Sequence, residues 1–145
     1  DVSAIRCAAR GCADARAAGK SIARILAELT AEAIVVGFSR GDAYATGISY
    51  LVVQPEFQEP SVLREFSEAV DRLDETIDAL MDMVAEAPRV VLGSENPFGE
   101  QCGTIATQLH LPAGHVFMIG IVGPMRMAYD RNLGFMRAVQ GIMTE

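Results

Sequence analysis

The chain lacks tryptophan, and it lacks any hydrophobic run long enough to cross a membrane, although 50% of its 145 residues are hydrophobic. A membrane-spanning helix needs about 20 consecutive apolar residues, and charged side chains interrupt this sequence before roughly 18. We therefore expect a soluble protein that does not bind a membrane. A chain of this length buries about 70% of its unfolded surface on folding, which favours a single domain over residues 1–145.

Basic residues are scarce, because the chain has 12 Lys and Arg against 19 Asp and Glu, which gives a net charge of −7. Proteins that bind nucleic acids neutralise phosphate groups with clustered basic side chains. The acidic composition therefore argues against direct contact between this chain and DNA.

Cysteine occurs three times, at Cys7, Cys12 and Cys102. An odd number does not suit a disulfide framework, and the spacing of Cys7 and Cys12 matches neither a Cys-x-x-Cys pair nor a zinc ribbon. Reduced thiols are typical of the cytoplasm, so we expect a cytoplasmic protein.

Motifs of common enzyme classes are also missing, including Gly-x-Ser-x-Gly, the Walker loop, Gly-x-Gly-x-x-Gly and His-Glu-x-x-His. His110 and His115 would face each other across a hairpin loop with Cys102 farther back, but zinc needs a fourth donor that the sequence does not define. A Cys102 nucleophile has no residue to orient a histidine base. We therefore expect no catalytic residues, no metal and no cofactor, and hence no enzyme activity.

The strongest positive signal is the stretch Val116–Met136. Val116–Val122 is apolar at nearly every position, which predicts a central strand buried on both faces. Gly123 and Pro124 are expected to end this strand, because Pro cannot donate to a strand ladder. From Met125 the period becomes helical and predicts a terminal helix that packs on the strand. The apolar stripe of that helix consists of Tyr129, Leu133, Phe135, Met136, Val139, Ile142 and Met143.

The N-terminal part predicts a helix followed by a hairpin. Residues 1–19 are rich in alanine and would form a packed helix or a frayed leader, and residues 20–30 have the spacing of an amphipathic helix. Residues 33–38 and 43–46 predict two strands joined by a turn that contains Arg40-Gly41-Asp42. This tripeptide is known from cell adhesion, but Gly and Asp are also typical of turns, and we favour a plain turn.

Residues 48–84 contain two helical stretches separated by a loop. Ile48–Val53 predicts one helical turn, and Pro60 suits the first turn of a helix of about 25 residues. The apolar positions of the longer helix are Leu63, Phe66, Val70, Leu73, Ile77, Leu80 and Val84. Its acidic residues follow the outer face, where a solvated surface is a commoner role than a metal site or a basic partner.

Two more strands complete the expected fold. Arg89–Leu92 predicts a strand, residues 93–99 a loop, and the alternation over Gly103–Leu111 a strand with one buried face. Leu111–Gly114 would turn the chain back into the central strand. We therefore expect an α+β domain with an antiparallel sheet of about five strands and with helices packed mainly on one face.

Five short stretches resemble a known protein family. They are Leu26–Thr30, Gly47–Leu51, Gln54–Phe57, Leu92–Asn96 and Gly120–Tyr129. Gly-Pro-x-Arg-Met-x-Tyr after a buried strand, with Gln-Pro-Glu-Phe upstream, resembles the heat-inducible transcription repressor HrcA of bacteria, in the part that follows its DNA-binding domain. The resemblance covers roughly residues 22–145 and implies a GAF-like regulatory domain.

By this resemblance, the chain is a regulatory domain that forms homodimers and controls an attached winged-helix domain, through which alone the protein would bind DNA. The resemblance also implies a chaperonin as a partner. Family members usually carry a helical dimerisation insert between the positions of Leu29 and Gly47, where this chain has room only for a hairpin. They also usually have an acidic residue at the position that Ala128 occupies in this chain. The alternative is a free-standing GAF-like sensor that binds a small ligand between the sheet and its covering loops.

Arg126 and Tyr129 are three residues apart at the expected start of the terminal helix, so they lie on nearly the same face. An Arg at the positive end of a helix is unfavourable by about 0.3–1 kcal/mol and needs an acidic or carbonyl partner. We expect Glu95 and Asn96 to supply that partner, with Arg126 as a structural clamp on the loop that ends at Phe98. The alternative is a binding site formed by the same five residues.

We predict that the chain forms a symmetric homodimer, because the apolar seam of residues 60–84 and the alanine-rich N-terminal helix offer more surface than one small sheet covers. Light scattering over a range of protein concentrations measures the mass directly. A monomer at the highest concentration would contradict the prediction.

Overall fold

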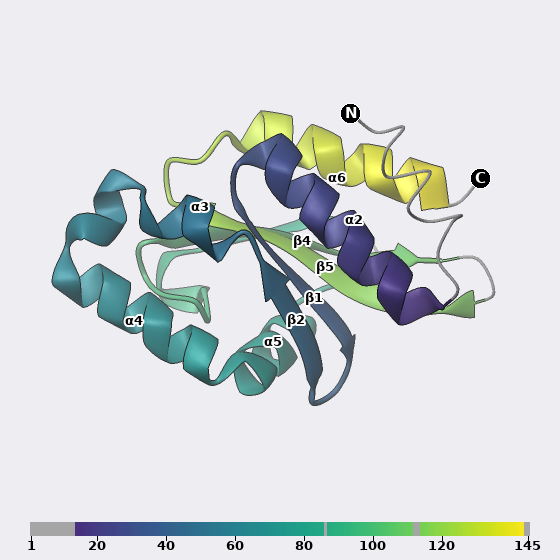
Figure 1. The fold of residues 1–145 in the computed structure, drawn as a ribbon, viewed down its shortest axis with the longest axis horizontal. Helices are drawn as coiled ribbons and strands as arrows, with labels where there is room; N and C mark the ends of the chain where they lie inside the picture. Colours follow the sequence, from purple (N-terminus) through teal and green to yellow (C-terminus); the bar gives the residue numbers. More distant parts are fainter. Residues whose placement is uncertain (1–13, 86, 112–113, 144–145) are drawn as a thin grey trace.

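The sheet has five antiparallel strands in the order β2-β1-β5-β4-β3 (Figure 1). The structure is a computed structural model that describes residues 14–85, 87–111 and 114–143. The strands are β1 (Ala33–Ser39), β2 (Asp42–Thr46), β3 (Arg89–Leu92), β4 (Cys102–His110) and β5 (Val116–Pro124). The expected α+β fold with five antiparallel strands is confirmed.

Helices cover both faces of the sheet. They are α2 (Ala15–Thr30), α3 (Ile48–Val52), α4 (Pro60–Asp71), α5 (Leu73–Met81) and α6 (Tyr129–Met143), with the 3-10 turns η1 (Pro55–Gln58) and η2 (Gly93–Glu95). The helices α2 and α6 pack on one face, and α3, η1, α4 and α5 pack on the other (Figure 1). The expectation of helices mainly on one face was wrong, because the central strands are apolar on both faces and each face needs a cover. Within the described ranges, no helix is long and apolar enough to cross a membrane.

The central strand β5 lies between β1 and β4 and is buried from Phe117 to Pro124. The strand runs two residues past its expected end at Val122, because Gly123 and Pro124 still pair with β4. Pro124 is its last residue, so the missing N–H falls at the end of the ladder. One further hydrogen bond continues the pairing, from Met125 N to Gln101 O (3.1 Å).

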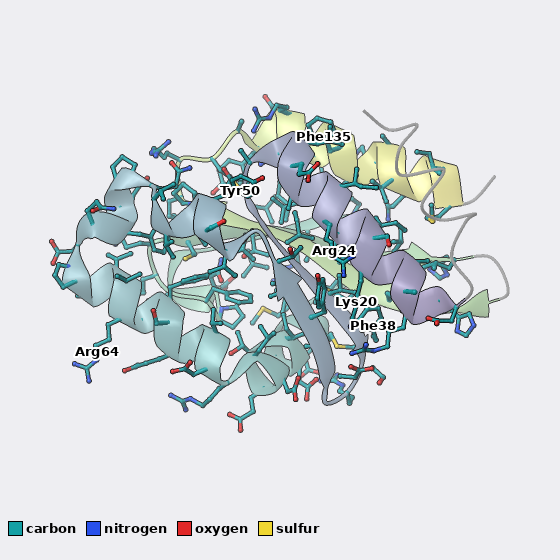
Figure 2. The ribbon with its side chains drawn as sticks, in the orientation of Figure 1. Lys20, Arg24, Phe38, Tyr50, Arg64 and Phe135 are labelled. Carbon is teal, nitrogen blue, oxygen red and sulfur yellow. The ribbon has the colours of Figure 1, made fainter. Side chains whose placement is uncertain are left out.

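Helix α2 begins earlier than residue 20, because residues 15–19 also belong to it. Asp14 caps its N terminus, where the Ala17 N–H donates to Asp14 Oδ1 (2.7 Å). On its outer side, Lys20 and Arg24 point toward β2 (Figure 2), where they lie 5.1 and 6.0 Å from the ring centre of Tyr44. The rest of the expected leader, residues 1–13, lies outside the described residues.

Strand β4 is buried on both faces along most of its length, although its alternating sequence predicted one exposed face. Its two buried threonine hydroxyls are hydrogen-bonded inside the protein. Asn96 Nδ2 lies 2.9 Å from Thr104 Oγ1, and Gln140 Nε2 of α6 lies 2.7 Å from Thr107 Oγ1. Hydroxyls paired in this way can be buried without a large desolvation cost, so the alternation indicated polarity but not exposure.

The expectation of one continuous helix from Pro60 was also wrong, because the helix breaks at Arg72, whose backbone (φ −114°, ψ 45°) leaves the helical range. The apolar spacing continues across the break, so periodicity could not reveal it. Helix α4 packs against η1, whereas α5 packs against β1 and β2 with Ile77 and Leu80 fully buried. A straight helix of about 25 residues would be roughly 38 Å long and could not follow both surfaces.

The turn between β1 and β2 contains Arg40, Gly41 and Asp42 and is tied to two helices. Arg40 pairs with Asp82 at the end of α5, and Asp42 pairs with Arg16 of α2 (2.8 Å). Gly41 has a φ of 76°, a conformation that favours glycine. Both charged side chains of the tripeptide form ion pairs with other residues of the same chain, which favours the turn interpretation over cell adhesion.

We predict that Thr76→Val lowers the free energy of unfolding by about 1–3 kcal/mol, because the Thr76 hydroxyl bridges the break between α4 and α5. Its Oγ1 lies 2.8 Å from Ala69 O and 2.9 Å from Arg72 O, and the residue is buried. Valine keeps the shape but removes the donor. Chemical denaturation measures the change, with Thr76→Ser as a control that keeps the hydroxyl. A valine variant as stable as the wild type would contradict the prediction.

Candidate functional site at the end of strand β5

Several of the stretches that carry the family resemblance meet where β5 ends. Residues 125–128 form a turn after β5, and α6 begins at Tyr129 rather than at Met125 as expected. Figure 1 shows the loop between β5 and α6 beside α3. The same turn lies beside Glu32, at the junction between α2 and β1.

Arg126 joins this turn to the segment that contains η1. Its Nε lies 2.6 Å from Glu56 Oε2, and its Nη2 donates to Glu56 Oε1 (3.0 Å) and to Gln54 Oε1 (2.8 Å). A two-point contact between a guanidinium and a carboxylate fixes orientation as well as distance. The Arg126 side chain is 57% exposed and the Glu56 side chain 23%, so the contact lies at the surface.

The partners expected for Arg126 were wrong, because its side chain contacts Glu56 and Gln54 rather than Glu95 and Asn96. Glu95 is exposed at the end of η2. Asn96 is buried, its Nδ2 donates to backbone oxygens of β3 and β4 (3.1 Å each), and its Oδ1 accepts from the Phe98 N–H (2.9 Å). Asn96 thus fixes the loop between β3 and β4, whereas Arg126 holds the segment after α3.

Tyr129 closes the turn on itself. Its Oη donates to Met125 O (2.7 Å) and lies over Gly103 of β4, where an added Cβ would be 2.0 Å away. Burial raises the pKa of Tyr129, and the nearby Cys102 and Glu32 raise it further. The hydroxyl therefore keeps its proton and remains a hydrogen-bond donor to the turn.

Glu32 was not identified as a site residue from the sequence. The signal that could have indicated it is the position of an acidic residue directly before an apolar strand. It is 7% exposed, and its Oε2 has no hydrogen-bond partner among the described residues. Gly123 leaves the space for it, because a Cβ at Gly123 would lie 2.0 Å from Glu32 Oε2. The pKa of Glu32 is raised from 4.5 to about 7, and burial is the largest cause. Arg131 and Arg126 act in the opposite direction and lower the pKa, whereas the negative charge of Glu56 raises it.

Arg131 and Asn132 of α6 complete the junction. Arg131 Nη2 donates to Thr30 O (3.0 Å), a carbonyl at the C terminus of α2, and Arg131 Nε donates to Asn132 Oδ1 (3.3 Å). The Glu32 N–H donates to Thr30 Oγ1 (3.3 Å). Asn132 is fully buried, and its Nδ2 has no partner among the residues that the structure describes. One end of the sheet therefore holds two buried polar atoms that are unpaired.

The residues considered for metal or nucleophilic chemistry do not form such a site here. Burial raises the pKa of Cys102 to about 12, so its thiol is protonated and unreactive at neutral pH. Within the described parts of the chain, no group of three or more His, Cys, Asp and Glu side chains could hold a metal ion.

The space between the sheet and α3, α4 and α5 is where a small-ligand sensor would hold its ligand. Phe57, Phe66 and Phe98 fill this space and are each 1% exposed. The ring centres of neighbouring pairs are 5.4 and 6.1 Å apart. A groove of about 280 Å³ lies outside this core and is lined by Glu65, Glu68, Ala69, Arg72, Glu75, Thr76 and Pro97. The aromatic packing favours a structural role for this face of the sheet.

Residues 6–133 match the family described as HrcA protein C terminal domain. The chain belongs to this family. The resemblance inferred from the five short stretches is therefore confirmed.

Curated relatives named heat-inducible transcription repressor HrcA show the same relationship. The protein of Gloeobacter violaceus is 27% identical over 103 residues, which cover 68% of this chain and 29% of the relative. The protein of Synechococcus sp. is 31% identical over 105 residues (70% of this chain and 31% of the relative), and that of Brevibacillus brevis is 30% identical over 90 residues (61% and 26%). The chain thus spans 26–31% of the length of these HrcA relatives.

Among solved structures, a protein described only as hypothetical, determined at 2.2 Å resolution, has a TM-score of 0.56 at 15% identity. The match covers 70% of this chain and 32% of that chain, and it supports the fold alone. An IclR homologue from Microbacterium sp. has a TM-score of 0.42 at 14% identity, over 83% of this chain and 61% of that chain.

We predict that Arg126→Ala lowers the free energy of unfolding by about 0.5–1.5 kcal/mol, because it removes a surface ion pair and a hydrogen bond to Gln54. The fold should remain, and faster amide hydrogen exchange should be confined to residues 54–58 and 125–128. Thermal unfolding and hydrogen exchange measure the two effects.

The matched control is Arg64→Ala, which removes an exposed pair with Glu68 on α4. Arg64 points into solvent from that helix (Figure 2), so its loss should cost no more than about 0.5 kcal/mol. Equal stability and equal exchange in the two variants would show that Arg126 is not a clamp.

The free energy of unfolding should fall as the pH rises through the range in which buried Glu32 loses its proton. The folded protein holds this proton up to about pH 7, whereas the unfolded chain holds it only up to the ordinary pKa of 4.5. The stabilising contribution is therefore complete below pH 4.5 and is lost by about pH 7, a change of about 3 kcal/mol. We predict that Glu32→Gln removes this pH dependence, as denaturation of both proteins at a series of pH values will measure. If the stability of the wild type and of Glu32→Gln changed with pH in the same way, the prediction would be wrong.

Proposed function

We propose that this chain is the regulatory and dimerisation domain of a heat-inducible transcription repressor and that it controls a DNA-binding domain attached to it. The observation that supports this most directly is the match of residues 6–133 to the HrcA C-terminal family. Because the chain spans 26–31% of its curated relatives, repression by the whole protein belongs to the proposal. The net charge of −7 is the reason to assign DNA contacts to the attached domain.

The geometry of the site supports a regulatory role rather than catalysis. Arg126 and Tyr129 are used to hold a turn and a neighbouring segment, and Cys102 is buried as a neutral thiol. We infer that the domain is not an enzyme and needs no cofactor. Its contribution would be the position and the opening of surface segments that a neighbouring domain can contact.

The partners that we propose are a second copy of the chain and a chaperonin, in the cytoplasm. The usual insert between the positions of Leu29 and Gly47 is replaced by the β1–β2 hairpin, so the dimer would form through other surfaces. The helix seam from which a dimer was predicted is divided at Arg72, and α4 buries only Phe66. The remaining apolar side of α4 is one surface available for such a contact.

A chimeric repressor tests the proposed function. The C-terminal domain of the HrcA protein from Gloeobacter violaceus would be replaced by this chain, and repression of a reporter gene under its operator would be measured before and after heat shock. We predict repression at the growth temperature and its release on heating. A chimera that lacks the C-terminal domain is the control, and it should fail to repress.

A chimera that binds the operator no better than this control would contradict a role in controlling the DNA-binding domain. Circular dichroism of the purified chimera establishes that the transplanted domain is folded, so that a failure to repress can be assigned to function. Repression that does not respond to temperature would contradict the heat-inducible part of the proposal.

A further inference from the structure

The Glu32 carboxyl lies beneath segments that are held in place by a contact at the surface. Gly123 of β5 lies against it, because a Cβ at Gly123 would be 2.0 Å from Glu32 Oε2. Met127 of the turn lies against Gly123 as well, since its Sδ would be 2.8 Å from the same Cβ. Gly47, just before α3, lies against the backbone of Glu32, where an added Cβ would be 2.6 Å from the carbonyl oxygen. We call the residues 47, 54–57 and 123–128 the cover.

The cover is held shut by Arg126. This residue follows Met125 in the turn and pairs with Glu56 and Gln54, so one side chain connects the two halves of the cover. The pair is partly exposed, and a surface pair of this kind contributes only about 0–1 kcal/mol. A free-energy cost of similar size at the Glu32 carboxyl is therefore enough to change the fraction of time that the cover is open.

We propose that Glu32 acts as a proton-operated latch, in which the cover stays closed over the neutral carboxyl and opens when the carboxyl loses its proton.

The arginines near Glu32 donate to other acceptors, so its Oε2 has no hydrogen bond in the closed state. Arg131 of α6 donates to Thr30 O and to Asn132 Oδ1, and Arg126 is engaged with Glu56. The Tyr129 hydroxyl donates to the turn, and the Asn132 Nδ2 lies at the same junction without a hydrogen bond to Oε2.

The charged groups that act on Glu32 from the packed elements have opposing effects. Arg131 and Arg126 favour the ionised carboxyl, whereas Glu56 of η1 opposes it, and burial has the largest effect. Tyr129 is neutral and adds no charge of its own, since its pKa is raised. A carboxylate oxygen that is buried without a donor, as Oε2 is here, carries a desolvation cost, which water relieves once the cover is open.

Amide hydrogen exchange of the 145-residue chain at about pH 5.5 and pH 7.5, corrected for the intrinsic exchange rates, tests the latch. The reporters are the N–H groups of Phe57 and Met127, which donate inside the cover to Gln54 O and Pro124 O (3.0 Å each). If opening exposes the carboxyl fully, its equilibrium constant should rise roughly twentyfold over this range, given pKa values of about 7 in the closed state and 4.5 in the open state.

Two variants separate the latch from general effects of pH. Glu32→Gln cannot ionise, so protection of the cover should no longer change between the two pH values. Glu28→Gln removes an exposed carboxyl from the last turn of α2 and should behave as the wild type. A wild-type cover whose corrected protection is the same at both pH values would overturn the proposal, and so would an equal pH response in Glu32→Gln.

A second measurement does not depend on the folding of any variant. Carbon-13 NMR follows the Glu32 carboxyl of the wild type directly, and a midpoint well above the ordinary range is expected. A midpoint in the ordinary range would overturn the latch. These outcomes are independent of the proposed repressor function, because they concern the chain alone and no DNA-binding domain.

Discussion

Burial of β5 on both faces is the constraint on which the rest of the structure depends. From Phe117 to Pro124 the strand is buried, and β1 and β4 beside it are also buried on both faces along most of their length. Such a strand can be stable only when hydrogen-bonded neighbours flank it and helices cover it above and below. The positions of α2 and α6 on one face, and of α3, η1, α4 and α5 on the other, follow from this requirement.

The candidate site is a consequence of how this buried strand ends. Where β5 reaches the edge of the core, the chain must leave through a turn, and Gly123 leaves space beside it that the Glu32 carboxyl occupies. The neighbouring segment after α3 is held by Arg126 at the surface. The buried Glu32 carboxyl therefore lies on the inner side of the cover, and the weak Arg126–Glu56 ion pair lies on its outer side. The free energies of closing and opening the cover thus differ only slightly.

Membership of the HrcA C-terminal family gives this balance a functional context. A regulatory domain needs segments whose opening costs little compared with unfolding of the whole domain, and such segments lie at the periphery of a rigid core. The interior of the sheet and the packed rings of Phe66 and Phe98 supply the rigid part. The cover at the end of β5 supplies a part that can respond to conditions, through groups that belong to the chain itself.

The sequence by itself determined the elements whose signals are local. The apolar run of Val116–Val122 predicted the central strand, and helical spacing predicted α2 and α6, because burial and periodicity are written in neighbouring residues. Only the tertiary structure decided the break at Arg72, the burial of both faces of β4, the partners of Arg126 and the environment of Glu32. The contacts of Arg126 and Glu32 depend on residues far apart in the chain. Arg126 meets Glu56 across 70 positions. Burial raises the pKa of Glu32, and Arg131 and Arg126, about 100 positions away, lower it. A local pattern states which residues avoid water, but which polar groups meet at the end of a sheet is decided only when the strands and helices have packed.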